Sequence, residues 1–519
     1  MSVQPLETEF GRKRAIDQSS CNKDFSCTKG FCPSFVSVVG GQLRKPQAPR
    51  ETQVFEALPE PALPALEGGV YSILVTGMGG TGVVTIGAIL GMAAHLEGKG
   101  CGLLDMAGLA QKGGSVWSHL RFAAQPADIK TIRIAGGGAD LILGCDLVVT
   151  GHAKTLATAR HGHTRVLANT HQSMPGDFTR QPDLQFPGQE LRQRVQAAVG
   201  DAGCAFVDAT RLATALLGDA IAANMFLLGA AYQRGWIPVS AQAIEQAIEL
   251  NGAAARLNRE AFVWGRRCAH HPALVEQAVQ ALKAQASASL SPVPLQSLDE
   301  RIALRAQFLR GYQNEALAQR YLATVQRVRE AEARLFPGSQ ALAEAVARYH
   351  FKLLAVKDEY EVARLYTHTD FRRQLEQQFE GDWHIEFHLA PPALAKKDPR
   401  TGLPRKQTFG RWMWWGMRAL ASLRGLRGTA LDVFGRTDER RAEREWQQRY
   451  EGDIEQALSV LETHRDPMQL TAAVELLSVP EHIRGFGHVK HAHLQRAAAR
   501  REAALQRLYR RSIPLKQAA

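Results

Sequence analysis

Three cysteines lie close together near the start of the chain, in the pattern Cys21-x5-Cys27-x4-Cys32, and a proline follows the last of them. The remaining cysteines stand singly in apolar segments, where a free cysteine is usually a small core residue. In a cytoplasmic chain thiols stay reduced, so a close group of cysteines indicates metal binding rather than disulfides. These three residues are therefore candidate metal ligands.

The spacing of the cysteines favours an iron-sulfur cluster. Bacterial ferredoxins bind such clusters through the run C-x2-C-x2-C-x3-C-P. Compared with that run, Asp24 stands where the second cysteine belongs, and the last gap is one residue longer. A carboxylate is a harder ligand than a thiolate and would leave its iron easier to lose. In a 4Fe-4S cluster the fourth ligand could be Asp24, water or a cysteine of another chain. Zinc binding and reactive or merely structural thiols are the alternatives.

A glycine-rich turn follows the first strongly apolar segment. Residues 77–82, Gly-Met-Gly-Gly-Thr-Gly, come after the buried-strand pattern of residues 71–76 and before an apolar helical pattern that reaches about His95. In this position G-x-G-x-x-G lets the backbone approach a phosphate, and the helix N-terminus supplies free N–H groups for it. The candidate binding residues are Gly77, Gly79, Gly80, Thr81 and Gly82.

The next strand pattern ends at Asp105, where a dinucleotide-binding fold would hold a ribose. From spacing alone, the glycine turn therefore predicts an NAD- or FAD-binding Rossmann domain. The alternative is that the glycines only permit close packing of the strand and the helix.

A second loop, residues 108–115, and the segment that follows it supply candidate cations. Two of them, His119 and Arg121, are two residues apart, so their side chains would share one face of a strand. A Lys-Gly-Gly turn at the carboxyl edge of the sheet favours binding of a phosphate or carboxylate, although an isolated Lys or Arg is often just solvated. The candidates in this stretch are Lys112, Gly113, Gly114, His119 and Arg121.

Two linkers and a change of pattern along the chain divide the sequence into five parts. Residues 70–285 predict a doubly wound, mainly parallel, Rossmann-like α/β domain. Residues 1–45 form the short, ferredoxin-like cysteine segment, and residues 46–69, rich in proline, form a linker. Residues 286–299 are a second linker, and residues 300–519 predict a mainly helical, basic domain.

Composition excludes several classes of protein. The 519 residues are 45% hydrophobic and 22% charged, with no apolar run long enough for a membrane span and no secretory signal pattern, so we expect a cytoplasmic protein. The net charge of +12 is concentrated late in the chain, but its arginines alternate with Glu and Ala at helical spacing. That pattern favours a solvated helical face over binding of nucleic acid or of an acidic partner protein. If the basic surface does bind a partner, an acidic ferredoxin is the first one to test. We find no Walker A, H-E-x-x-H or G-x-S-x-G motif.

Three blocks of the sequence resemble the bacterial fused indolepyruvate ferredoxin oxidoreductases, which are thiamine-dependent 2-oxoacid oxidoreductases. Residues 17–41 resemble the iron-sulfur segment of that family, and Asp24 in place of a cysteine belongs to the resemblance. ILVTGMGGTGVVTIGAILGMAAHLEGKG, LDMAGLAQKGGSVWSHLR and IELNGAAARLNREAFVWGRR are similar to the gamma domain shared with pyruvate ferredoxin oxidoreductases. KLLAVKDEYEVARLYT, LRGLRGTALDVFGRTDERR and PEHIRGFGHVK resemble the C-terminal domain.

The resemblance implies oxidative decarboxylation of an aryl pyruvate, with indolepyruvate as the first expectation. Coenzyme A is the co-substrate, and the products are aryl acetyl-CoA, carbon dioxide and two electrons for ferredoxin. In the family, domains that bind thiamine diphosphate and Mg precede the cysteine block. The resemblance therefore implies that a separate thiamine-binding subunit completes the enzyme, or that the chain is a non-catalytic binding or assembly remnant.

The resemblance also assigns roles to the candidate residues. It implies that Cys21, Cys27 and Cys32 hold a cluster that receives electrons from the thiamine adduct. The loops at 77–82 and 112–114 would close over the active site or accept part of coenzyme A. It displaces the dehydrogenase interpretation, because the glycine loop of the gamma domain is not associated with a nicotinamide cofactor.

Overall fold

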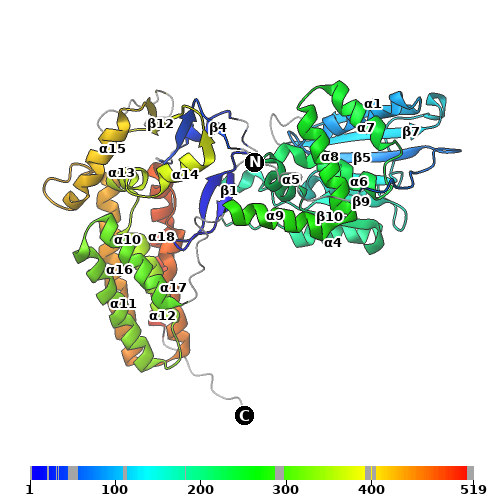
Figure 1. Ribbon diagram of the computed structural model, residues 1–519. Helices are drawn as coiled ribbons and strands as arrows, with labels where there is room; N and C mark the ends of the chain where they lie inside the picture. Colours follow the sequence, from blue (N-terminus) through cyan, green and yellow to red (C-terminus); the bar gives the residue numbers. More distant parts are fainter. Residues whose placement is uncertain are drawn as a thin grey trace, which may run out of the picture. The chain divides into compact units, whose positions relative to one another are not determined.

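The computed structural model of the chain forms two compact units. The first, the α/β unit, comprises Met1–Asp24 and Arg44–Pro292, and the second, the helical unit, comprises Phe25–Leu43 and Val293–Ala519. Figure 1 shows the helices and strands of each. The structure describes residues 3–19, 21, 23–30, 32, 34–44, 57–108, 114–179, 181, 183–286, 297–391, 399 and 405–510.

A six-stranded sheet with the order β10-β9-β8-β5-β7-β6 forms the centre of the α/β unit. The strands β5, β8, β9 and β10 are parallel, whereas β7 lies antiparallel to both of its neighbours, β5 and β6. The sheet is mainly parallel with one reversed strand, which confirms the predicted α/β fold class. The strands are β5 (Tyr71–Met78), β6 (Gly100–Ala107), β7 (Ser115–Ala123), β8 (Leu141–Gly144), β9 (Arg165–Asn169) and β10 (Cys204–Val207).

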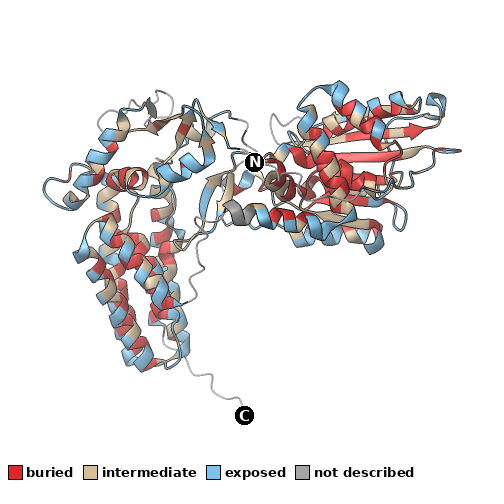
Figure 2. Ribbon diagram, viewed as in Figure 1, coloured by how far each residue is buried: buried red, intermediate tan, exposed pale blue. Residues whose placement is uncertain are grey.

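Helices cover both faces of this sheet, which is why its central strands are apolar on both sides. Ile73 and Val75 of β5 pack into one core cluster, and Leu74 between them packs into another. Figure 2 shows the buried central strands. The first cluster includes α1 (Val83–Leu96), α5 (Ala209–Leu217), α6 (Ala223–Gln233), α7 (Ala241–Asn251), α8 (Ala255–His270) and α9 (Pro272–Ala286), and the second includes α2 (Leu147–Thr150), α3 (Ala153–Leu156) and α4 (Gly188–Val199).

Amphipathic helices make up most of the helical unit, which confirms the mainly helical C-terminal part. Ser297 caps the first of them in a reciprocal capping box with Glu300, and Asp466 caps another just before Pro467. Such caps satisfy N–H groups that the first turn leaves unpaired. The helices are α10 (Leu298–Tyr312), α11 (Glu315–Leu335), α12 (Ala341–Leu354), α13 (Glu359–Thr367), α14 (Phe371–Gln378), α15 (Met413–Ser422), α16 (Asp438–Thr463), α17 (Pro467–Ser478) and α18 (Gly487–Tyr509).

Two short sheets join the segment after Phe25 to the C-terminal part of the chain. The antiparallel pairs are β3 (Val36–Val39) with β12 (His384–Leu389), β12 with β13 (Gln407–Phe409), and β4 (Gln42–Leu43) with β11 (Phe379–Glu380). Val36 and Val38 pack on a core that contains the fully buried Phe387. The second half of the cysteine segment is therefore an integral part of the helical unit.

A two-stranded hairpin of β1 (Val3–Leu6) and β2 (Lys13–Ile16) opens the α/β unit. Within the described parts of the two units, no helix combines the length and the apolar character that crossing a bilayer requires.

Candidate functional site

The glycine turn lies at the carboxyl end of β5. This strand includes Gly77 and Met78, so the turn itself spans residues 79–82, and α1 starts directly after Gly82. The Thr81 N–H and hydroxyl both donate to the Met78 carbonyl, at 3.0 and 2.7 Å. The Gly79 N–H donates to the Gly114 carbonyl at 2.7 Å, which ties the two predicted loops together.

The glycines of this turn serve different purposes. A Cβ on Gly77 would lie 2.6 Å from Thr81 Oγ1 and 2.9 Å from Cys145 Cβ, so residue 77 must be small for packing. Gly82 has φ +80° and lies against the side-chain amide of Asn224. Gly80 has φ +95° and open space where a Cβ would point. Close packing explains Gly77 and Gly82, whereas Gly80 leaves the turn accessible.

Asp146 adds a carboxylate beside this turn. It follows β8, caps α2 by accepting from the Val149 N–H at 2.9 Å, and is only 4% exposed. Burial raises its pKa, although N–H groups of Val149 and Met78 oppose that shift. Its second oxygen, Oδ2, has no hydrogen-bond partner among the described residues. Asp146 is thus a buried acceptor with spare capacity, and the sequence interpretation missed it.

Polar residues continue along the same edge of the sheet. Asn169, at the end of β9, donates to the Cys145 carbonyl at 3.1 Å and to Thr210 Oγ1 at 2.7 Å. Asp208, after β10, lies 3.5 Å from His171 Nδ1. Burial raises the pKa of Asp208, but its bonds from His171 and the Arg211 N–H outweigh burial and lower it. The carboxyl edge of a parallel sheet is where α/β proteins bind ligands, and here it gathers a glycine turn and several polar side chains.

Two of the predicted cations, His119 and Arg121, lie on β7 away from the glycine turn. Arg121 pairs with Ser72 at the beginning of β5, far along the strand from the glycine turn. His119 is buried, and its Nδ1 accepts from the Ile134 N–H at 3.2 Å. Burial lowers the pKa of His119, and nearby Arg133 lowers it further, which favours a neutral structural imidazole. Lys112 and Gly113 lie outside the described residues.

The register also places Asp105 away from the glycine turn. Asp105 is exposed on β6 and pairs with Ser118, so the reversed strand β7 separates β6 from β5. A dinucleotide-binding fold needs this acidic residue on the strand next to the glycine loop. The NAD or FAD interpretation therefore lacks its ribose contact.

The four candidate metal ligands are divided between the two units. Cys21 and Asp24 belong to the α/β unit, and Cys27 and Cys32 to the helical unit. In the described part of the chain, no three His, Cys, Asp or Glu side chains lie close enough to hold a metal ion. Thiolates are the preferred ligands of an iron-sulfur cluster, so the donor types suit one, but the structure does not bring these four described residues together.

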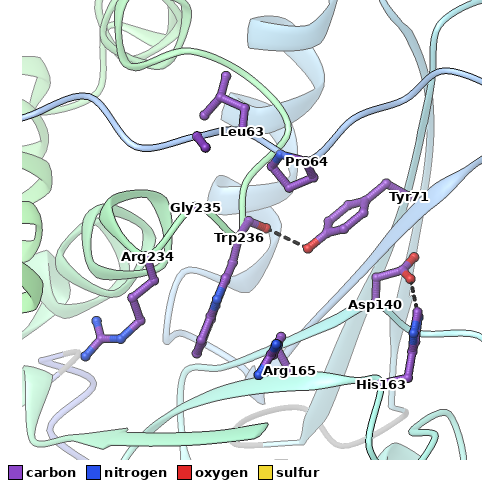
Figure 3. A pocket seen from close by; sticks show the side chains of 10 residues that line it. Leu63, Pro64, Tyr71, Asp140, His163, Arg165, Arg234, Gly235 and Trp236 are labelled. Carbon is purple, nitrogen blue, oxygen red and sulfur yellow. Dashed lines mark hydrogen bonds and ion pairs between the residues drawn. The ribbon is translucent and has the colours of Figure 1, made fainter.

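A pocket of about 370 Å³ lies at the opposite edge of the large sheet, where β5 begins. Figure 3 shows Tyr71 donating to the Trp236 carbonyl, at 3.0 Å, and His163 Nε2 next to Asp140 Oδ1, at 2.7 Å. The pocket contains no residue predicted from the sequence. Its lining is Ala62, Leu63, Pro64, Tyr71, Asp140, His163, Arg165, Arg234, Gly235 and Trp236.

Two family models match the chain. Residues 72–268 match the family "Pyruvate ferredoxin/flavodoxin oxidoreductase", and residues 298–503 match a family of unknown function, DUF6537. The second match covers most of the described helical unit.

Curated relatives match a part of the chain. The indolepyruvate oxidoreductase subunit IorB of Pyrococcus horikoshii is 28% identical over 201 residues, which are 38% of this chain and 96% of the relative. The subunit of the same name from Archaeoglobus fulgidus is 28% identical over 181 residues, which are 34% of this chain and 83% of the relative.

Solved structures also align with part of the chain. The gamma subunit of a keto/oxoacid ferredoxin oxidoreductase from Geobacter sulfurreducens aligns with a TM-score of 0.28 and 23% identity, over 38% of this chain and 98% of that subunit. A 2-oxoglutarate:ferredoxin oxidoreductase from Magnetococcus marinus aligns with a TM-score of 0.29 and 17% identity, over 39% of this chain and 31% of that chain.

Proposed function

We propose that the chain, whose residues 72–268 match the pyruvate ferredoxin/flavodoxin oxidoreductase family, is a subunit of an aryl pyruvate:ferredoxin oxidoreductase. The observation that carries the proposal is the match to subunits named indolepyruvate oxidoreductase, which extends over 96% of the relative from Pyrococcus horikoshii. The aryl pyruvate, in the first place indolepyruvate, and coenzyme A are converted to aryl acetyl-CoA, carbon dioxide, a proton and two electrons for ferredoxin.

A thiamine-binding partner subunit completes this enzyme. Thiamine diphosphate with Mg, bound by that partner, supplies the carbanion chemistry of decarboxylation. The chain described here contributes the carboxyl edge of its large sheet. The accessible turn at Gly80 and the N-terminus of α1 present backbone N–H groups to an anion, such as a phosphate of coenzyme A. Asp146 Oδ2 offers an acceptor beside them.

The cysteine segment holds the electron-transfer group in this proposal. Cys21, Cys27 and Cys32, with Asp24 as the fourth ligand, bind a 4Fe-4S cluster, which supplies one-electron transfer to ferredoxin. Three thiolates make the set suitable for iron. The net charge of +12 suits an acidic ferredoxin as the electron acceptor. The cytoplasm, with its reduced thiols and soluble acceptors, is the proposed location.

The test is reconstitution with the thiamine-binding partner. The tagged full-length chain is co-expressed with the candidate subunit and purified anaerobically, and iron, acid-labile sulfide and thiamine diphosphate are measured. We expect dye reduction that requires both an aryl pyruvate and coenzyme A, with pyruvate and 2-oxoglutarate as comparison substrates. A complex that turns over equally well without this chain would contradict the proposal, and a stable complex with no oxidation of any 2-oxoacid would favour an assembly role.

A further inference from the structure

Helix α15 is apolar on its outer face as well as on its inner face. Met417 and Ala421 are buried in a core cluster of the helical unit, together with residues of α13. On the other side Trp412, Trp415 and Leu423 are 64%, 69% and 49% exposed. Because these three residues are separated by three and eight positions, they share one face of the helix. We call this set of three residues the α15 stripe.

Neighbouring side chains hold the two tryptophan rings of the α15 stripe in place. The Trp412 ring meets the Phe409 ring edge to face, with 5.9 Å between their centres. The Arg418 guanidinium lies 5.5 Å from the centre of the Trp415 ring. Ordering large side chains on binding costs conformational entropy, so rings that are already packed favour association with a partner.

The charge around the α15 stripe is positive and uncompensated. The sequence contains no Asp or Glu from residue 399 to 431, and Asp432, which follows, is buried. Arg418 and Arg424 form no ion pair among the described residues, and Arg424 Nε is buried without a hydrogen-bond partner there. Burial lowers the pKa of His368, and these two cations lower it further. A partner that covers the stripe should therefore carry carboxylates at its rim.

The composition of this surface favours a protein partner. Trp and Arg are enriched in protein interfaces and Lys is depleted, and every cation from residue 407 to 431 is an arginine. A second copy bound through the same face would place like charges against each other. Permanent interfaces are more apolar than transient ones, so the exposed tryptophans favour a stable subunit over a ferredoxin that binds briefly.

We propose that the α15 stripe is the docking surface for the thiamine-binding subunit, which presents an apolar groove bordered by carboxylates. This inference rests on the proposed function, because that function requires such a subunit. It gives the segment that matches a family of unknown function, residues 298–503, a role in assembly of the enzyme.

The test measures the affinity of the full-length chain for the thiamine-binding subunit. Trp415→Ser removes an apolar contact, and Arg418→Glu reverses a charge at the rim. The matched controls are Met468→Ser, at a residue 72% exposed on α17, and Arg496→Glu, at an exposed residue of α18. Kd is measured by biolayer interferometry at low and high salt, and circular dichroism is recorded for every variant.

We expect Trp415→Ser and Arg418→Glu each to raise Kd roughly tenfold or more, with both controls unchanged. Added salt should weaken the wild-type complex more than the Arg418→Glu complex, because the removed charge no longer contributes to binding. If Trp415→Ser does not fold, Arg418→Glu decides by the same measurement.

Equal affinity of all variants overturns the inference and leaves the proposed function standing, whereas failure of the wild-type chain to bind the subunit overturns both. Two further measurements examine other occupants of the α15 stripe. These are binding to vesicles of phosphatidylcholine and phosphatidylglycerol, and self-association in sedimentation velocity. If either depends on Trp415 while Kd for the subunit does not, the stripe binds a lipid surface or a second copy and the inference is wrong.

Discussion

The side-chain amide of Asn224 packs directly against the α-carbon of Gly82, so a Cβ on residue 82 would overlap it. Residue 82 also has φ +80°, the left-handed region that L residues with a side chain avoid. The start of α1 is therefore shaped by contact with α6, and Gly82 has a packing role whatever the turn binds.

Alanine substitutions at Gly82 and Gly80 distinguish the cost of a packing overlap from the cost of backbone strain. Gly82→Ala combines left-handed strain with the overlap on Asn224, and we expect a loss of roughly 3 kcal/mol of unfolding free energy. Gly80→Ala introduces only the backbone strain, because the space around residue 80 is open, and we expect it to lower the unfolding free energy by about 1–2 kcal/mol. Urea denaturation followed by tryptophan fluorescence measures both, and equal losses would contradict this division of roles.

A second prediction concerns the crossing of α6 and α8. A Cβ on Gly265 would overlap the Phe226 carbonyl oxygen, and one on Gly229 would overlap the Phe262 carbonyl oxygen. Since backbone atoms cannot move aside as a side chain can, Gly265→Ala should cost about 1–3 kcal/mol. The control is Gly91→Ala in α1, where an added Cβ would lie 4.0 Å from Cys101 Sγ, an ordinary van der Waals contact. That change should be neutral or stabilising by up to about 1 kcal/mol, and a similar loss in both variants would refute the explanation.

The sequence predicts the local features of the α/β unit well, because they depend on neighbouring residues. The predicted strand at 71–76 corresponds to β5, the glycine turn at 77–82 to the end of β5 and the turn after it, and the predicted helix to α1. The position of β7 between β5 and β6 depends on pairing between distant segments, which no local pattern specifies. That insertion is why Asp105, at the end of a correctly predicted strand, lies away from the turn.

The partners of the cysteine segment could not be predicted either, because they too are distant in the sequence. Strand β3 is short, and its partner β12 begins at His384, so this pairing and the hydrogen bond from Lys406 to the Cys32 carbonyl become visible only in the structure. Asp146, by contrast, could have been found from the sequence. It follows the apolar run LILGC, and a polar residue at the carboxyl end of a buried parallel strand lies at the edge where ligands bind.

Protonation of the Glu451 carboxylate should lower the stability of the protein at acidic pH. Its hydrogen bond from His350, with Nε2 at 3.1 Å, and its ion pair with Arg320, at 2.6 Å, lower its pKa to about 2 despite partial burial. A folded pKa below the ordinary value means that the stabilisation is present above about pH 4.5 and is lost as the pH falls towards 2. Because the carboxylate is partly exposed, we expect on the order of 1–2 kcal/mol. Urea midpoints at pH 7, 4 and 2.5 should fall more steeply for wild type than for Glu451→Gln, and parallel curves would contradict the assignment.

The buried ion pair of Arg427 and Asp358 gives the largest expected loss of stability. Arg427 Nε lies 2.6 Å from Asp358 Oδ2, and Nη2 lies 2.8 Å from Oδ1, with both side chains less than a tenth exposed. The guanidinium also stacks 3.7 Å from the centre of the Tyr312 ring. Arg427→Met leaves the Asp358 carboxylate buried without its cation, which typically costs about 3–5 kcal/mol.

Two variants distinguish this ion pair from a general loss of charge. Arg427→Lys keeps the charge but cannot form both bonds or the same ring contact, so we expect an intermediate loss. Arg441→Met removes an arginine whose ion pair with Asp438 is exposed, and its unfolding free energy should change by no more than about 0.5 kcal/mol. Denaturation midpoints in urea rank the three variants. If Arg427→Met were no more destabilising than Arg441→Met, the buried pair would not be what holds α13 to the loop before α16.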